Sequence, residues 1–328
     1  MIEYELGVED LADTRFAISP LAETVFSLWT LVAPGRTAAH LPWRSTALSR
    51  LDGLEAPLLL SLATLAVPDF LTPRPASYTP TLKDELATVR ATPLHIVRRD
   101  LLAAYAPAPL PDVLRAAAAA DAQPVLALLE TLCNLLHHYW DLALAPVWPQ
   151  MRLVLEADTT YRARQLAVGG ARLLFADMHP NLRWQDGVLH IDKMIGRHRA
   201  AAAGRGLLLM PSIFAYKPVP PVSASDPPSL AYPARGLGTL WAPAPAADAT
   251  ALNALLGAAR TRLLHLLDKP QPTVELARQL RVTPSAVSQH LQVLHATGLV
   301  TRTRDRRHVL YRRTPLADQL IRHCAPAA

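Results

Sequence analysis

Residues 283–311 constrain the fold of this chain most, because they hold a full set of local signals for a helix followed by a hairpin. Thr283 suits the cap of a helix and Pro284 its first position, where the missing N–H costs nothing. Gly298 is a typical residue at a helix C-terminus. The apolar positions recur at helical spacing: Val287, Leu291 and Leu294. These features predict a short helix with one buried stripe.

The opposite face of this helix is short, uncharged and rich in hydrogen-bonding groups. It carries Ser285, Ser288, Gln289 and Gln292, with the capping Thr283 at its start. Such side chains suit the base edges in a DNA major groove. Residues 299–302 and 308–312 then predict two strands around a basic turn, which we expect to contact phosphates. The arginines of this predicted wing are Arg302, Arg304, Arg306 and Arg307.

The preceding residues complete a three-helix unit. Residues 251–267 have a helical apolar pattern, and the prolines at 270 and 272 break it. Thr273 is placed to cap a short second helix over residues 274–280. Arg281 and Val282 form the turn into the helix that starts at Pro284. The order of elements predicts a winged helix-turn-helix over residues 251–328, with a helix at its C-terminal end.

Residues 255–315 resemble the winged helix of ArsR/SmtB-type bacterial transcriptional regulators. The matching motifs are VELA at 274–277, SAVSQHLQVL at 285–294, TGLV at 297–300 and the arginine–tyrosine spacing of 307–311. The resemblance implies a homodimer that binds an operator with inverted-repeat character, usually as a repressor. Arg306 stands where the family often has a turn glycine. Pro272 and Val274 stand where the family's metal sensors have thiols, so the family's metal motif is absent.

The charge distribution supports the DNA interpretation. Between Arg260 and Arg313 there are 11 basic and 3 acidic residues, whereas residues 1–259 hold 21 basic and 23 acidic residues. The net charge of +6 therefore originates at one end of the chain. A localised basic face is expected of a protein that contacts phosphates. The alternative is a solvated basic hairpin on a winged helix that contacts proteins.

Residues 1–242 predict an α+β domain, mostly helical with a small antiparallel sheet, followed by a Pro/Ala-rich linker at 243–250. An opening strand is predicted at 3–8 and a hairpin at 182–191, with its turn at Asp186 and Gly187. A buried strand is predicted at 206–214, at an edge or a bulge because it contains Pro211. Gly169 and Gly170 are expected to end the last of the predicted helices. Those helices cover residues 20–31, 82–89, 98–106, 111–122, 124–144 and 149–168.

The N-terminal residues also resemble an uncharacterised domain that precedes ArsR-type winged helices. The matching segments are RFAISPLAETVFSL, RARQLAVGG, GLLLMPSIF and YPARGLGTLW. This resemblance implies one regulator architecture and no activity.

Other candidate sites are weak. His137 and Asp141 share a helical face and fit a metal, but a packed helix with a polar edge is the simpler interpretation. Arg162 and Arg164, with Glu156 and Asp158, predict a solvated or ion-paired helix face, and an anionic-ligand site is the lesser alternative. For His290, a structural hydrogen bond and a phosphate contact are equally compatible with the pattern. His323 and Cys324 lack partners at ligand spacing and fit a tail helix at a dimer interface.

Two functions from different classes fit the sequence. The first is a repressor, ArsR-like in its DNA-binding part, whose N-terminal domain responds to a small organic effector rather than a metal. The second is a DNA-binding protein whose N-terminal domain is a ligand-free dimerisation or partner-docking module. An enzyme is not expected, because no catalytic motif and no cofactor loop is present. The short apolar runs, the acidic start and the two cysteines predict a cytoplasmic protein that does not contact membranes. Its 29 arginines against 4 lysines suggest a bacterial genome rich in GC.

Overall fold

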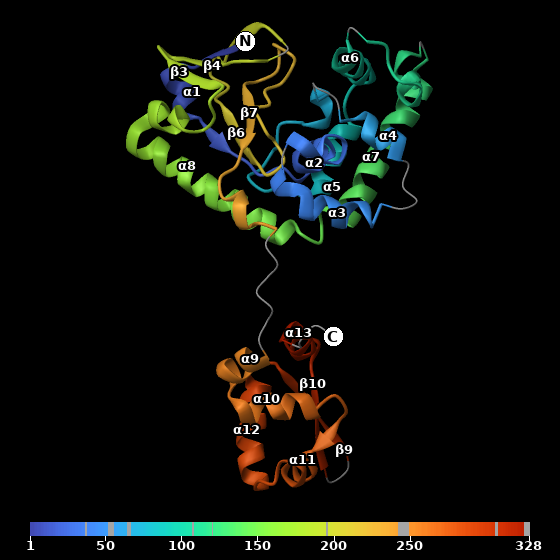
Figure 1. The fold of residues 1–328 in the computed structure, drawn as a ribbon, viewed down its shortest axis with the longest axis vertical. Coiled ribbons are helices and arrows are strands. Elements are labelled where there is room, and N and C mark those ends of the chain that lie inside the picture. Colours follow the sequence, from blue (N-terminus) through green and yellow to red (C-terminus); the bar gives the residue numbers. More distant parts are fainter. Residues whose placement is uncertain are drawn as a thin grey trace. The chain divides into compact units, whose positions relative to one another are not determined.

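The computed structural model describes residues 1–328 except residues 37, 52–55, 64–66, 107, 120, 195, 242–248, 306–307 and 325–328. The chain divides into two compact units, Met1–Trp241 and Ala242–Ala328 (Figure 1). Most of the linker predicted at residues 243–250 lies outside the described residues. Its last two positions belong instead to helix α9 (Ala249–Leu256).

One sheet of the N-terminal unit has four strands in the order β3-β4-β1-β5. The predicted hairpin forms β3 (Leu182–Gln185) and β4 (Val188–Ile191), with Asp186 and Gly187 at positive φ in its turn. Strand β1 (Ile2–Glu5) pairs antiparallel with β4 and parallel with β5 (His198–Ala201). In the hairpin, Leu182 lies opposite Ile191 and Trp184 opposite Leu189, which places these four apolar side chains on one face.

A second sheet, which is entirely parallel, has the order β2-β6-β7. Its strands are β2 (Arg15–Phe16), β6 (Leu208–Ser212) and β7 (Ser229–Pro233). The sequence predicted one small antiparallel sheet. The structure adds this parallel sheet and, in the first sheet, the parallel pair of β1 with β5. Parallel pairing joins residues far apart in the sequence, so no local turn motif predicts it.

The expectation that Pro211 marks an edge or a bulge is wrong, because β6 is the central strand of this sheet. The carbonyls of Leu207 and Leu209 accept hydrogen bonds from the β2 side, from Arg15 and Ala17. By alternation along the strand, Pro211 also faces that side, where β2 has already ended. A central strand accommodates this proline because no donor is needed at its position.

Eight α-helices of the described N-terminal residues accompany these sheets. Their bounds are α1 (Val8–Ala12), α2 (Pro20–Val32), α3 (Leu41–Leu48), α4 (Ala56–Ser61), α5 (Leu82–Arg90), α6 (Leu94–Tyr105), α7 (Ala122–Ala143) and α8 (Trp148–Ala176). Figure 1 shows α8 beside the strands and α2 to α7 gathered on the other side of the unit. Helix α2 is buried from Pro20 to Leu31, so it forms the centre of the helical part.

Of two helix predictions, one is wrong and one is confirmed. Residues 111–122 do not form an α-helix: Asp112–Ala118 is a 3₁₀ helix, whose buried residues Leu114 and Ala117 lie three positions apart, as that helix requires. The expectation that Gly169 and Gly170 end the last of these helices is confirmed. Gly170 (φ 61°, ψ −162°) is not helical, so α8 consists of two helices that meet at a kink there, and a Cβ on Gly169 would come within 2.5 Å of Leu173 Cβ.

The C-terminal unit contains five helices and one three-stranded sheet within its described residues. Their bounds are α9 (Ala249–Leu256), α10 (Ala258–Leu266), β8 (Gln271–Pro272), α11 (Thr273–Leu280), α12 (Pro284–Ala296), β9 (Val300–Asp305), β10 (His308–Arg313) and α13 (Pro315–Cys324). The helix predicted over residues 251–267 is divided at Gly257, whose φ of 84° interrupts the α conformation. The predicted Thr273 cap is also wrong, since Pro272 holds the cap position and α11 begins at Thr273.

Candidate nucleic-acid interface

Helix α12 begins and packs as the sequence predicts. The Thr283 side chain accepts a hydrogen bond from the N–H of Ala286 at 3.3 Å, and Pro284 is the first helical residue. The apolar stripe is fully buried in the unit's core: Val287, Leu291 and Leu294. Gly298 follows the helix at φ 73°, a left-handed conformation that a glycine adopts without steric cost.

The residues predicted to contact DNA share the outward face of α12. Thr283, Ser285, Gln289 and Gln292 are exposed, and Ser288 is half-buried. Ser285, Ser288, Gln289 and Gln292 are spaced three or four positions apart, which places them in one row on the helix surface. The structure therefore brings these five side chains together on a surface that carries amides and hydroxyls but no charge. His290 lies half-buried at the edge of this row.

The turn before α12 holds a strained residue. Arg281, which closes α11, adopts a left-handed conformation with φ 55° and ψ 43°. Its N–H donates to the Arg278 carbonyl at 3.3 Å, and the N–H of Val282 donates to the Ala277 carbonyl at 3.1 Å. These bonds satisfy carbonyls at the end of α11 and set the angle at which the chain enters α12.

One exposed arginine of α11 is already engaged. Arg278 donates to both carboxylate oxygens of Glu275, at 2.6 and 3.1 Å. These hydrogen bonds favour the ionised carboxylate and lower the pKa of Glu275. The local charge of α11 is thereby partly neutralised.

Strands β9 and β10 form an antiparallel hairpin that β8 extends to three strands. Arg302 lies opposite Tyr311 and Arg304 opposite Val309. Side chains alternate between faces along a strand, so both arginines share the face of Val300, whose side chain enters the core. Arg302 and Arg304 lie farther along the strand than this core and are exposed to solvent. Arg306 and Arg307, also predicted for the wing, lie outside the described residues.

Arg313, at the base of the hairpin, has a structural position. Its Nη1 donates to the Leu264 carbonyl and its backbone N–H to the Leu267 carbonyl, both at 3.1 Å. Its Nε lies 3.0 Å from the Asp318 carboxylate in α13. The Arg313 side chain thus connects the hairpin to the C-terminal end of α10 and to α13. Long-range packing alone identifies this role, because the sequence shows Arg313 only as one of many basic residues.

The comparisons with known proteins agree with this geometry. Residues 259–302, from α10 to the start of β9, match the family described as bacterial regulatory protein, arsR family. The C-terminal unit carries an arsR-type helix-turn-helix. This match supports a DNA-binding regulator of transcription. No curated protein and no solved structure matches the chain.

The other candidate residues lie outside this interface. His137 Nε2 is 3.6 Å from Asp141 Oδ2 on the surface of α7, and no group of three metal-ligating side chains occurs in the described part of the chain. Arg162 and Asp158 are buried rather than solvated, at 1% and 0% side-chain exposure, and Arg162 also binds Asp177. They form a structural ion-paired group where α8 folds back on itself.

Three remaining predictions are placed as follows. Glu156 pairs with Arg152 at 2.7 Å, one turn away on α8. The side chains of His323 and Cys324 lie outside the described residues. Among the described helices, none is both long and apolar enough to cross a membrane.

Proposed function

We propose that this chain is a transcriptional repressor that binds duplex DNA as a homodimer, with α12 in the major groove and the β9–β10 wing on the sugar-phosphate backbone. The observation that carries the proposal is the uncharged, hydrogen-bonding face of α12, flanked by exposed arginines on β9. Amide side chains such as Gln289 discriminate base edges, whereas arginines supply affinity that does not depend on sequence.

Apolar exposure supports the dimer. Helices α9 and α13 lie against each other (Figure 1), and each presents a leucine to solvent. Leu255 is 73% exposed and Leu316 51% exposed. Burial of these side chains against a second copy would remove apolar surface from water. The two α12 helices would then read half-sites related by a two-fold axis.

We further propose that the N-terminal unit responds to a small organic effector and has no catalytic role. A ligand-responsive regulator needs two states that bind the effector with different affinity. The unit of Met1–Trp241 far exceeds what dimerisation of a helix-turn-helix requires, and it contains an apolar pocket. The alternative, a ligand-free docking module, predicts that no small molecule alters operator affinity.

The proposal excludes regulation by a transition metal of the family's usual kind. Pro272, the cap of α11, and Val274 of α11 stand where the family's metal sensors have thiols. Zinc, copper and nickel titrated against the operator complex should leave it intact. Release at micromolar metal, abolished by changing His323 and Cys324, contradicts the organic-effector proposal.

Footprinting on the DNA that flanks the protein's own gene tests the DNA-binding proposal without any ligand. We expect two protected half-sites with centres about 10 base pairs, or a multiple of one helical turn, apart. Protection of one asymmetric site contradicts the dimer, and the absence of any sequence-dependent protection contradicts specific DNA binding.

A further inference from the structure

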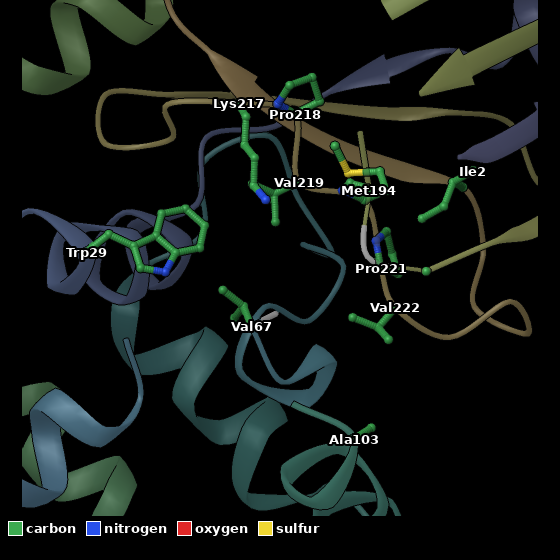
Figure 2. A pocket seen from close by; sticks show the side chains of 12 residues that line it. Ile2, Trp29, Val67, Ala103, Met194, Lys217, Pro218, Val219, Pro221 and Val222 are labelled. Atoms are coloured by element: carbon green, nitrogen blue, oxygen red, sulfur yellow. The ribbon is translucent and has the colours of Figure 1, made fainter. Parts of the chain in front are cut away.

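Two of the hollows in the N-terminal unit differ in what they can hold. The apolar pocket is lined by residues that include Trp29, Val67, Met194 and Lys217 (Figure 2). Its volume of about 130 Å³ is smaller than the cavity of about 150 Å³ that holds a bare benzene ring. A second hollow, of about 380 Å³, lies where the C-terminal end of α7 and the N-terminal end of α8 meet the start of α5. The second hollow has room for a larger ligand.

Two half-buried tryptophans, Trp140 of α7 and Trp148 of α8, line this larger space, which we call the tryptophan hollow. The centroids of their rings lie 5.0 Å apart, with an angle of 62° between the ring planes. The turn that joins α7 to α8 fixes this arrangement, because the Trp140 carbonyl accepts from the N–H groups of Leu144 and Ala145 at 2.9 and 2.8 Å. The remaining apolar lining consists of Ile18, Pro20, Pro80 and Leu82. A flat aromatic ligand therefore finds ring faces and edges to pack against.

The part of the lining that leads into α5 is held by hydrogen bonds. Thr81 and Asp84 form a capping box, in which the N–H of Thr81 donates to the Asp84 carboxylate at 3.0 Å and the N–H of Asp84 donates to Thr81 Oγ1 at 3.2 Å. The buried Glu85 of α5 accepts from Ser19 Oγ at 2.6 Å and from the N–H of Leu21 at 2.8 Å, which connects α5 to the start of α2. Because these segments are already ordered, a ligand loses little free energy in ordering them.

The charged side chains of the tryptophan hollow are hydrogen-bond donors. Among the described residues that line it, Lys83 and Arg152 carry positive charge and no side chain is acidic. Arg152 pairs with Glu156 through its Nε at 2.7 Å, which leaves the N–H groups of both Nη atoms for a ligand. Helical spacing places Arg152 one turn from Trp148 on the same face of α8. Glu156 and Asp84 lie outside the lining and balance the two cations, so attraction of an anion depends on direct, charge-assisted hydrogen bonds.

We propose that the tryptophan hollow binds a planar two-ring aromatic carboxylate, with its rings against Trp140 and Trp148 and its carboxylate on the Nη atoms of Arg152. Such a ligand has about twice as many non-hydrogen atoms as benzene, which occupies a cavity of about 150 Å³, so a hollow of about 380 Å³ accommodates it. The inference rests on the proposed function in one respect: it gives the proposed organic effector a site and a chemical class.

Packing connects the tryptophan hollow to the end of the N-terminal unit. Ala143 ends α7, three residues after Trp140, and its carbonyl accepts from the indole Nε1 of Trp43 at 3.0 Å. The Trp43 ring in turn lies 6.1 Å from the ring of Trp241, the last described residue before residues 242–248. A ligand that shifts the end of α7 therefore acts on the residues from which the chain leaves the unit.

Naphthoate and naphthamide are matched probes, since they share the ring system and the number of non-hydrogen atoms and differ in charge. Calorimetry measures their binding to the full chain without DNA. We expect naphthoate to bind with a Kd on the order of 1 mM or tighter, and about fivefold more tightly than naphthamide, because hydrogen bonds between charged groups are the stronger ones. Arg152→Gln should remove this preference. Arg164→Gln, the same change at an exposed position of α8 outside the hollow, should preserve it.

Trp140→Leu tests the location, because it keeps an apolar side chain and removes the ring. We expect it to weaken the binding of both probes by about fivefold or more. Trp184→Leu is the matched control, since Trp184 is also half-buried and its ring stacks on that of Phe175 at 5.8 Å, outside the hollow. Unfolding curves verify that each variant is folded. Arg152 is exposed, so Arg152→Gln tests the proposal even if Trp140→Leu does not fold.

Four results each overturn the proposal: equal affinity for the two probes, a preference that Arg152→Gln leaves unchanged, unaltered binding to folded Trp140→Leu, or no binding of naphthoate at about 10 mM. None of these results alters the footprint, which is recorded without ligand. Failure of this inference is therefore distinguishable from failure of the DNA-binding proposal.

Discussion

Trp241 donates from its indole Nε1 to Nδ1 of the buried His40 at 2.9 Å, and this bond fixes the last described residue of the N-terminal unit to its core. The two rings also meet edge-on, and the His40 ring packs on Phe214 at 5.0 Å. Burial lowers the pKa of His40, so its ring stays neutral and keeps the lone pair that accepts the bond. The chain leaves the N-terminal unit from this anchored position.

Trp241→Phe should destabilise the N-terminal unit by about 1–2 kcal/mol, because it preserves an aromatic ring but leaves the buried acceptor of His40 unsatisfied. Urea unfolding measures the loss. Trp148→Phe is the matched control, since Trp148 is half-buried and packs on Trp140 at 5.0 Å. An equal effect of the two changes would show that ring volume, and not the hydrogen bond, holds Trp241 in place.

Glu23 makes the stability of the N-terminal unit depend on pH. Burial in α2 raises the pKa of Glu23 to about 8, although the N–H of Ile213 donates to both of its oxygens at 3.1 Å. A carboxyl group with a raised pKa in the folded state stabilises fully below its ordinary value of 4.5. That stabilisation is lost as the pH rises toward 8. Above pH 4.5 the unfolded protein releases the proton of Glu23, whereas the folded protein must keep this proton or bury a carboxylate charge.

Glu23→Gln should therefore remove this pH dependence, since the amide oxygen still accepts from Ile213 and no proton is exchanged. Relative to the variant, the wild-type free energy of unfolding should fall by at most about 1.4 kcal/mol per pH unit between pH 4.5 and 8. Urea unfolding across this range supplies the comparison. Parallel curves for the two proteins contradict a raised pKa.

Arg281→Gly should stabilise the C-terminal unit by about 1 kcal/mol, because a left-handed residue with a Cβ is strained and glycine is not. Scanning calorimetry of the full chain reports the change. Arg278→Gly, three residues earlier inside α11, should have the opposite sign, since glycine costs about 1 kcal/mol in a helix interior. A loss of stability in both variants would mean that the Arg281 side chain makes a contact worth more than the strain.

Local signals explain which elements the sequence predicts. Helix α12 follows from a cap, a proline and an apolar stripe within one segment, and the β3–β4 turn from the neighbouring Asp186 and Gly187. The parallel sheet was not predicted, since Leu209 of β6 pairs with Phe16 and Leu230, which are distant in the sequence. The break at Gly257 is local, but the apolar pattern continues across it and hides it.

The candidate sites likewise divide into one that local sequence signals predict and others that depend on contacts between distant residues. The outward face of α12 was predictable because its residues lie on one helix and its cap. The pocket was not, because Trp29, Val67, Met194 and Lys217 come from separate segments that only the tertiary fold brings together. The burial of Arg162 likewise depends on Asp177, which lies beyond the kink of α8.

Neutralising the wing should weaken binding to all DNA sequences alike. Arg304→Ser removes one exposed cation from β9, so the slope of log affinity against log salt should decrease by about one unit. Arg262→Ser on α10, also exposed, is the matched control and should leave the slope unchanged. A slope that Arg304→Ser does not alter contradicts a phosphate contact at this position.

The central claim is that the outward face of α12 reads base edges, and Gln289→Ala tests it most directly. Affinity for the footprinted operator and for random DNA is measured by fluorescence anisotropy at one salt concentration. The exposed Gln150 of α8, in the N-terminal unit, provides the matched change, Gln150→Ala. We predict that Gln289→Ala weakens operator binding by about 1–3 kcal/mol and leaves random DNA unaffected, while Gln150→Ala changes neither. Unchanged affinity of Gln289→Ala for both DNAs would contradict the account.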